Sequence, residues 1–274
     1  MTQVALLPSR GIIKLTGPDR ASFLNGLVSN DVLKAAPEQL VWAALLTPQG
    51  RYLVDFFIFS DGDCLLLDLP RPEIPTLIAK LRRFRLRAKV DIEEATEEFK
   101  VYAIWQGEPP ASPLTGLDPR LPEAGYRCLS SQSYETSATI HDYAVHRIGL
   151  GLPDGPPDLE PEKTLLLEAG FDELNGIDWK KGCYMGQELT ARTKYRGLVK
   201  RKLFPVTLSH PDVPAGTPIL ANGHEVGSLR SVEGVNGLAM LQLSALTQPL
   251  MASGALLSAR IPHWMNQKEP HPAG

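Results

Sequence analysis

The sequence is poor in the residues that hold metals and disulfides. Its 274 residues include three cysteines and six histidines. Cys64, Cys128 and Cys183 are too far apart for a Cys-x-x-Cys redox pair or a zinc knuckle, and the histidines lack ligand spacing. We therefore expect free thiols in a reducing compartment and no stably bound metal.

Long apolar runs and an excess of positive charge are also missing. No run reaches the ~18–20 apolar residues of a membrane helix, and the N-terminal segment lacks the pattern of a signal peptide. The net charge of −3 argues against a surface built for nucleic acid. With 43% hydrophobic and 22% charged residues, the composition is typical of a folded protein. These absences predict a cytoplasmic protein without direct contacts to a membrane or nucleic acid.

The hydrophobic pattern changes along the chain and predicts separate units. An amphipathic helix carrying Ile74, Leu77 and Leu81 alternates with strand-like runs, which indicates an α+β fold. These runs cover residues 11–15, 41–46, 52–59, 64–69, 86–92 and 99–105. Proline- and glycine-rich stretches at 106–125 and 151–161 are interpreted as connections. From Leu203 onward the pattern shows only short strands and turns, typical of a small β-barrel. The strands expected there cover residues 203–208, 226–232, 238–243 and 255–261.

The segment 180–192, KKGCYMGQELTAR, holds the most unusual chemistry. Cys183 follows two lysines and precedes a predicted helix, and a thiol near cations at a helix N-terminus has a lowered pKa. The same pattern also fits a buried cysteine where glycines allow close packing. Residues 178–202 contain eight Lys or Arg and two acids. This basic run fits either an acidic partner or phosphate, or a solvated edge.

This segment resembles the signature of the YgfZ family, folate-binding relatives of the glycine-cleavage aminomethyltransferase that are implicated in iron–sulfur cluster assembly and repair. The resemblance is carried by Lys181, Gly182, Cys183, Tyr184, Gly186, Gln187, Glu188 and Arg192. It extends to the Leu-Glu-Ala-Gly run at 167–170, to the opening at 15–31 and to the block at 46–55.

The resemblance implies an α+β, three-domain aminomethyltransferase-like ring with two α+β domains and a small C-terminal β-barrel. Residues 1–40 and 140–202 would form a discontinuous folate-binding domain. Residues 41–139 would form the second α+β domain, and residues 203–265 the barrel. Tetrahydrofolate or a one-carbon derivative would occupy the central opening.

The resemblance also implies roles for individual residues. Glu168 would accept two parallel hydrogen bonds from the pterin, since one carboxylate can pair with two neighbouring donors. Asp55 would lie near the nitrogens that carry the one-carbon unit, Tyr184 would stack near the folate, and Arg196 would bind its glutamate tail. Cys183 would be the reactive thiolate. A solvent-facing Asp55 on an edge strand and a surface Glu168 in a turn remain the alternatives, although a carboxylate inside an apolar strand is costly unless paired.

The implied function is that of a tetrahydrofolate-binding accessory factor for the assembly or repair of iron–sulfur clusters. Its partners would be iron–sulfur client proteins, including cluster-dependent tRNA modification enzymes, or cluster carriers. One thiol cannot hold a cluster alone, because four ligands are the norm. Two alternatives remain: a folate-dependent aminomethyltransferase or demethylase, and a non-catalytic folate-binding scaffold. The sequence leaves open whether the protein is an enzyme.

Overall fold

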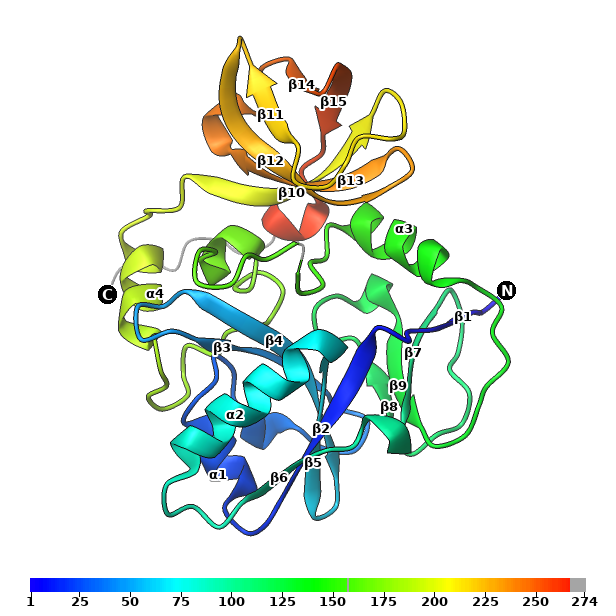
Figure 1. Ribbon diagram of the computed structural model, residues 1–274, viewed down its shortest axis with the longest axis vertical. Coiled ribbons are helices and arrows are strands. Elements are labelled where there is room, and N and C mark those ends of the chain that lie inside the picture. Colours follow the sequence, from blue (N-terminus) through cyan, green and yellow to red (C-terminus); the bar gives the residue numbers. More distant parts are fainter. Residues whose placement is uncertain (157, 267–274) are drawn as a thin grey trace.

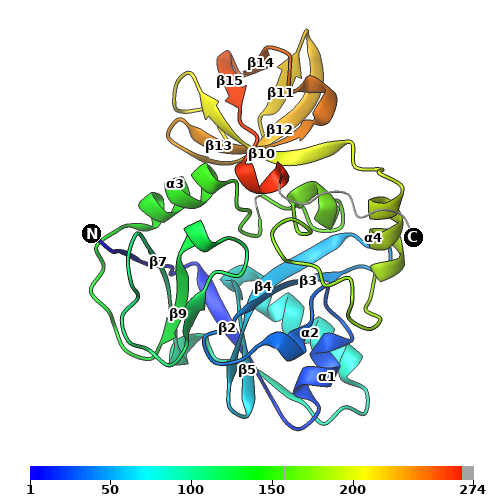
Figure 2. The same cartoon turned by 180° about the vertical axis from the view of Figure 1, so that it is seen from behind.

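The computed structural model describes residues 1–156 and 158–266, which form three β-sheet units (Figure 1). A five-stranded sheet and a four-stranded sheet lie below a closed barrel, with helix α3 between the four-stranded sheet and the barrel. The view from behind shows α4 on the opposite flank (Figure 2). None of the helices in the described residues is long and apolar enough to cross a membrane.

The five-stranded sheet is antiparallel, in the order β3-β4-β5-β2-β6. Its strands are β2 (Arg10–Thr16), β3 (Val41–Leu46), β4 (Tyr52–Asp61), β5 (Cys64–Pro70) and β6 (Asp91–Glu94). Side chains alternate between two faces along each strand. Phe56 therefore packs with α1 (Arg20–Asn25) and α2 (Ile74–Arg85), whereas Phe57 faces the core shared with the rest of the molecule.

Two expectations for this region change. The strand expected at 86–92 is shorter and begins later, because α2 ends at Arg85, its C-cap Leu86 has a positive φ of 45°, and the chain turns before β6. A domain boundary after residue 40 would divide this sheet. Strand β2 precedes residue 40, yet it pairs with β5 and β6, which follow it.

The four-stranded sheet has the order β1-β7-β9-β8. Its strands are β1 (Gln3–Leu6), β7 (Lys100–Trp105), β8 (Thr115–Leu117) and β9 (Tyr126–Ser130). The connection expected at 106–125 thus includes one short edge strand. Helix α3 (Ile140–Leu150) follows, begun by a capping box between Thr139 and Asp142 and ended by left-handed Gly151.

The C-terminal unit is a closed barrel in the order β10-β13-β12-β11-β14-β15. Its strands are β10 (Arg201–Leu208), β11 (Pro218–Ala221), β12 (His224–Glu233), β13 (Asn236–Gln242), β14 (Leu250–Ala252) and β15 (Ala255–Ala259). The Asn222-Gly223 turn joins β11 to β12 with both residues at positive φ. Helix α4 (Gln187–Tyr195) precedes β10. The predicted α+β fold with a small C-terminal barrel is confirmed.

Candidate functional site

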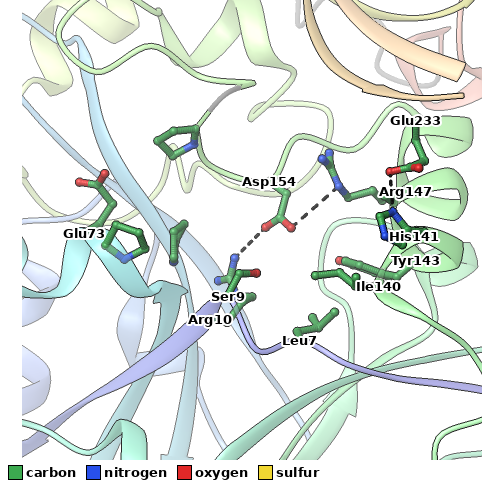
Figure 3. Close-up of a pocket in the computed structure, with 14 residues that line it drawn as sticks. Leu7, Ser9, Arg10, Glu73, Ile140, His141, Tyr143, Arg147, Asp154 and Glu233 are labelled. Atoms are coloured by element: carbon green, nitrogen blue, oxygen red, sulfur yellow. Dashed lines mark hydrogen bonds and ion pairs between the residues drawn. The ribbon is translucent and has the colours of Figure 1, made fainter. Parts of the chain in front are cut away.

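A buried ionic cluster lies where the three units meet (Figure 3). Arg10 on β2 donates from Nη1 to Asp154 Oδ1 at 2.7 Å and also pairs with the Asp68 carboxylate on β5. Arg147 on α3 donates to Asp158 Oδ2 at 2.7 Å and to Ser231 Oγ on β12 at 2.7 Å. The cluster therefore ties the first sheet and α3 to the barrel.

The cluster continues beneath the loop that contains Asp154. Arg120 forms a two-pronged pair with Asp118, at 2.9 and 2.7 Å, and Arg127 donates to Asp68 Oδ2 at 2.9 Å. The Arg120 and Arg127 guanidinium carbons lie 4.8 and 3.9 Å from the centre of the Phe57 ring. These arginines are buried, but each is paired, as buried charges must be.

A cavity of about 440 Å³ opens above Arg10. Its walls combine Asp154, Arg147 and Tyr143 with the apolar side chains of Leu7, Pro70, Pro72, Ile140, Ala144 and Pro156. The Asp154 side chain is 18% exposed, and its Oδ2 lies 3.9 Å from Arg147 Nε, beyond hydrogen-bonding distance. Burial alone would raise the pKa of Asp154, but Arg10 and Arg147 outweigh it and hold this pKa well below its usual range. Asp154 is therefore an ionised acceptor that faces the cavity.

Asp55 lies in the interior of β4, not at a solvent-facing edge. It is 1% exposed and accepts hydrogen bonds from Trp42 Nε1 at 2.8 Å and from Tyr52 Oη at 2.7 Å. Burial raises the pKa of Asp55, although both hydrogen bonds oppose the shift. An ideal Cβ at Gly155 would lie 3.9 Å from Asp55 Oδ1, so the carboxylate packs beneath the loop that borders the cavity.

Glu168 lies in the short 3-10 segment Leu166–Ala169 and is 6% exposed. It accepts from Arg201 Nε at 2.8 Å, from Arg201 Nη2 at 3.3 Å and from the Leu165 backbone N–H at 3.1 Å. Arg201 belongs to β10. The carboxylate thus links the barrel to the segment before α4 and is not the surface side chain of the alternative interpretation.

Cys183 is exposed in the loop before α4. Helix α4 begins at Gln187 with left-handed Gly186 as its N-cap, so Cys183 precedes the helix and lies three residues before the N-cap. Cys64 is half-buried at the start of β5, and Cys128 is buried in β9. Cys183 is therefore the accessible thiol among the three.

Lys181 anchors this loop. Its Nζ donates to the carbonyl oxygens of Asn25, Val28 and Asn30, each at 2.7 Å, and lies 5.2 Å from the centre of the Tyr184 ring. Burial lowers the pKa of Lys181 to about 8. The ammonium thus donates to backbone carbonyls, and these hydrogen bonds hold the Cys183 loop against the N-terminal segment.

The four residues expected around a folate lie outside the lining of the five main cavities that the described residues form. Tyr184 is 6% exposed, and its Oη has no hydrogen-bond partner among the described residues, whereas Arg196 is exposed at the end of α4. The five main cavities formed by residues 1–156 and 158–266 are lined by other side chains than Asp55, Glu168, Tyr184 and Arg196. Sequence reasoning missed Arg10, Arg147 and Asp154, which do line one.

The comparisons with known proteins decide the family. A family model described as the C-terminal β-barrel domain of CAF17 matches residues 200–267. The iron–sulfur cluster assembly factor IBA57 of Homo sapiens is 31% identical, over 94% of this chain and 84% of that protein. The chain belongs to the IBA57 family. It spans 60% of the relative from Mycosarcoma maydis, at 35% identity over 82% of this chain, and 56% of the relative from Neurospora crassa.

A solved structure supports the fold of this IBA57-family chain. The glycine cleavage system aminomethyltransferase T from Bartonella henselae superposes with a TM-score of 0.74, covering 97% of this chain and 87% of that one. At 13% identity the likeness extends to the fold alone. The expected YgfZ resemblance is thus supported at the level of a related family with an aminomethyltransferase-like fold.

One expectation is overturned by the same relatives. The absence of a signal-peptide pattern predicts a cytoplasmic protein. That prediction is wrong, because the matched IBA57 relatives are named as mitochondrial proteins and point to a mitochondrial location.

Proposed function

We propose that this protein acts in the assembly of iron–sulfur clusters and that Cys183 is the thiol that contacts the cluster. The observation that carries the proposal is the exposure of Cys183 in a loop fastened by Lys181, in a chain whose relatives are named as cluster assembly factors. A cluster is cargo here, and a thiol that exchanges it must be open to solvent and held in place.

The number of thiols limits how a cluster is held. Clusters take four protein ligands, usually cysteine thiolates. Cys64 lies in the five-stranded sheet and Cys128 in the four-stranded sheet, and both are far from Cys183 in the sequence. The other ligands would therefore come from a carrier or client protein, and the cluster would be shared or passed on rather than stored.

The surface of α4 and of the loops on either side of it suits such a partner. Its exposed cations are Lys180, Arg192, Arg196 and Lys200, and its exposed apolar side chains are Leu189, Tyr195 and Leu198. Only Glu188 contributes an exposed acid to this stretch from 180 to 200. An acidic carrier or client, including a cluster-dependent tRNA modification enzyme, would dock beside Cys183.

We also propose that the 440 Å³ cavity binds tetrahydrofolate. Its size and mixed lining suit a small organic ligand, and ionised Asp154 can accept from the adjacent N–H and amino donors of a pterin. Tyr143 and the prolines offer flat apolar surfaces to the rings. Asp154 takes the acceptor role expected for Glu168, because Asp154 lines this cavity although Arg10 pairs with its Oδ1, whereas Glu168 lies outside the cavity lining and pairs with Arg201. When bound, tetrahydrofolate would supply the nitrogens that carry a one-carbon unit.

Cluster transfer tests the first proposal. A carrier protein loaded with an iron–sulfur cluster would be mixed with this protein and with an acceptor protein that lacks its cluster. Absorbance and circular dichroism would follow the transfer of the cluster to the acceptor. Cys183→Ser should abolish the acceleration that the protein provides, whereas Cys64→Ser should preserve it. Equal rates for the Cys183→Ser variant and the unaltered protein would refute the role of this thiol.

Calorimetric titration with tetrahydrofolate tests the second proposal. Asp154→Asn should weaken binding at least about tenfold, because a charged acceptor is lost. Glu168→Gln should bind with nearly unchanged affinity. If Glu168→Gln weakens binding and Asp154→Asn does not, Glu168 is the acceptor for the pterin. If the unaltered protein does not bind tetrahydrofolate, the folate proposal is wrong.

A further inference from the structure

Positive charge is concentrated at the end of α2 and in the turn that follows it. Between Glu73 and Asp91 the sequence has six cationic side chains and no acidic one. They are Lys80, which is half-buried, and the exposed Arg82, Arg83, Arg85, Arg87 and Lys89. Figure 1 shows α2 on the five-stranded sheet, in the half of the molecule away from the barrel. Although the chain has a net charge of −3, this end of α2 is therefore strongly positive.

The helix itself accounts for only part of this charge. Cations in the last turn of a helix interact favourably with its free carbonyl groups. Arg82 and Arg85 also donate to the backbone carbonyl oxygens of Ile92, at 2.9 Å, and Val90, at 3.3 Å. Arg87 lies beyond the end of the helix. Within the described part of the chain none of the six cations forms an ion pair, so their charges remain available to an anionic partner.

Leu86 adds an apolar side chain to the same surface. It is the C-cap of α2 and is 88% exposed, and its φ of 45° lies in the region where glycine is favoured. A leucine here brings backbone strain and also exposes apolar surface to water. Phe84, two residues earlier, is exposed as well. Strain that is kept at an exposed apolar residue indicates a binding surface, because nothing in the folded chain gains from it.

We propose that residues 82–89 dock this protein on a membrane surface that is rich in anionic lipids. The guanidinium groups would pair with lipid phosphates, and Leu86 would enter the boundary between headgroups and acyl chains. The sequence predicts no contact with a membrane because it lacks a membrane-spanning run, but a surface contact needs no such run. The proposal concerns α2 and depends on neither the cluster proposal nor the folate proposal.

The exposed leucine favours a lipid surface over other anionic partners. RNA would supply phosphates to the arginines, but it offers no hydrocarbon layer to Leu86. An acidic protein segment would bind best in a groove, whereas Leu86 and Arg87 line none of the five main cavities that the described residues form. Charged and apolar side chains that project together suit a layer with phosphates outside and hydrocarbon beneath.

Co-sedimentation with lipid vesicles tests the proposal on the full chain. The protein should bind vesicles of phosphatidylcholine that contain about 30% phosphatidylglycerol, and not vesicles of phosphatidylcholine alone, because only the former carry negative charge. Raising the salt from about 0.1 M to about 1 M should weaken this binding at least about tenfold, because it shortens the screening length from about 10 Å to about 3 Å.

A double variant tests the contribution of charge. Arg83→Ala/Arg87→Ala should weaken binding to the anionic vesicles at least about tenfold, since each cation near such a surface contributes to the attraction. Lys100→Ala/Arg260→Ala removes the same charge from two exposed positions on the other two sheet units and should change the binding little. Equal binding by the two double variants would overturn the proposal.

Leu86→Gly tests the entry of the apolar side chain into the bilayer. It should weaken vesicle binding roughly fivefold, because an apolar contact is lost. Glycine adopts the φ of this position without strain, so thermal denaturation should show equal or higher stability, and unfolding cannot explain the loss. Leu256→Ser is the control, because it removes an exposed leucine from the barrel strand β15 and should keep the binding.

The remaining outcomes assign the surface to another partner. If Leu86→Gly binds the vesicles as tightly as the unaltered protein, the leucine does not enter the bilayer and the proposal is wrong. Tighter binding to a short RNA duplex than to vesicles, unchanged by Leu86→Gly, would assign the surface to nucleic acid. If the unaltered protein does not bind anionic vesicles, the proposal is also wrong. Loss of binding to a cluster carrier protein in Arg83→Ala/Arg87→Ala would then assign the surface to an acidic protein.

Discussion

The Nζ of Lys181 donates to the carbonyl oxygen of Val28 at 2.7 Å, across 153 positions of the chain. The same ammonium bonds to the carbonyls of Asn25 and Asn30. These carbonyls lie at the last residue of α1 and in the segment just after it, so one side chain joins the Cys183 loop to the N-terminal segment. The motif lysine thus has a structural explanation that does not require contact with a ligand.

Replacing Lys181 with methionine should destabilise the fold. The change leaves three carbonyls without their donor, and we expect a loss of about 2–3 kcal/mol in the free energy of unfolding. Thermal denaturation should show a fall of roughly 5–10 °C. Lys180→Met is the matched control, because the neighbouring side chain is exposed and should change the midpoint little. Equal midpoints for the two variants would contradict the fastening role.

Lys181 also shows where sequence reasoning reached its limit. Strand alternation located β10, β12, β13 and β15 because that pattern is local, and the motif located the Cys183 loop. The partners of Lys181 lie more than 150 positions away, and no local pattern encodes them. The central cluster is hidden for the same reason: Arg10 and Asp154 are 144 positions apart and meet only when the units assemble.

The two glycines of the motif should respond differently to alanine. Gly186 has a φ of +84°, and a Cβ there would lie 2.7 Å from the Thr47 carbonyl oxygen, so Gly186→Ala combines strain with a clash. We expect a loss of about 2–4 kcal/mol in the free energy of unfolding. A Cβ at Gly182 meets nothing within 4 Å, so Gly182→Ala should be nearly neutral. Urea unfolding of both variants checks the contrast, which a neutral Gly186→Ala would refute.

Asp55 should make stability depend on pH. Burial raises its folded-state pKa above the ordinary 3.8, so the folded protein keeps the proton in a range where the unfolded chain has lost it. As pH rises through that range, the contribution of Asp55 to stability falls. The amide introduced by Asp55→Asn cannot titrate, so the cost of this substitution should shrink as pH rises.

Urea unfolding between about pH 4.5 and 7 measures this difference between the two proteins. Tyr52→Phe removes a donor that opposes the shift, so the pKa of Asp55 should rise further and the pH dependence should become steeper. A cost of Asp55→Asn that stays constant over this range would mean that Asp55 ionises as easily in the folded protein as in the unfolded chain.

Glu168 and Arg201 should be coupled in stability. Their side chains join the 3-10 segment Leu166–Ala169 to β10, and Arg201 is 39% exposed, so solvent screens part of the attraction. A double-mutant cycle with Glu168→Gln and Arg201→Gln should give a coupling energy of about 1 kcal/mol. The single Glu168→Gln change should cost somewhat more, because the carboxylate also accepts from the Leu165 N–H. Additive effects of the two changes would show that the pair is not formed in solution, and Glu168 would then be free to meet a ligand.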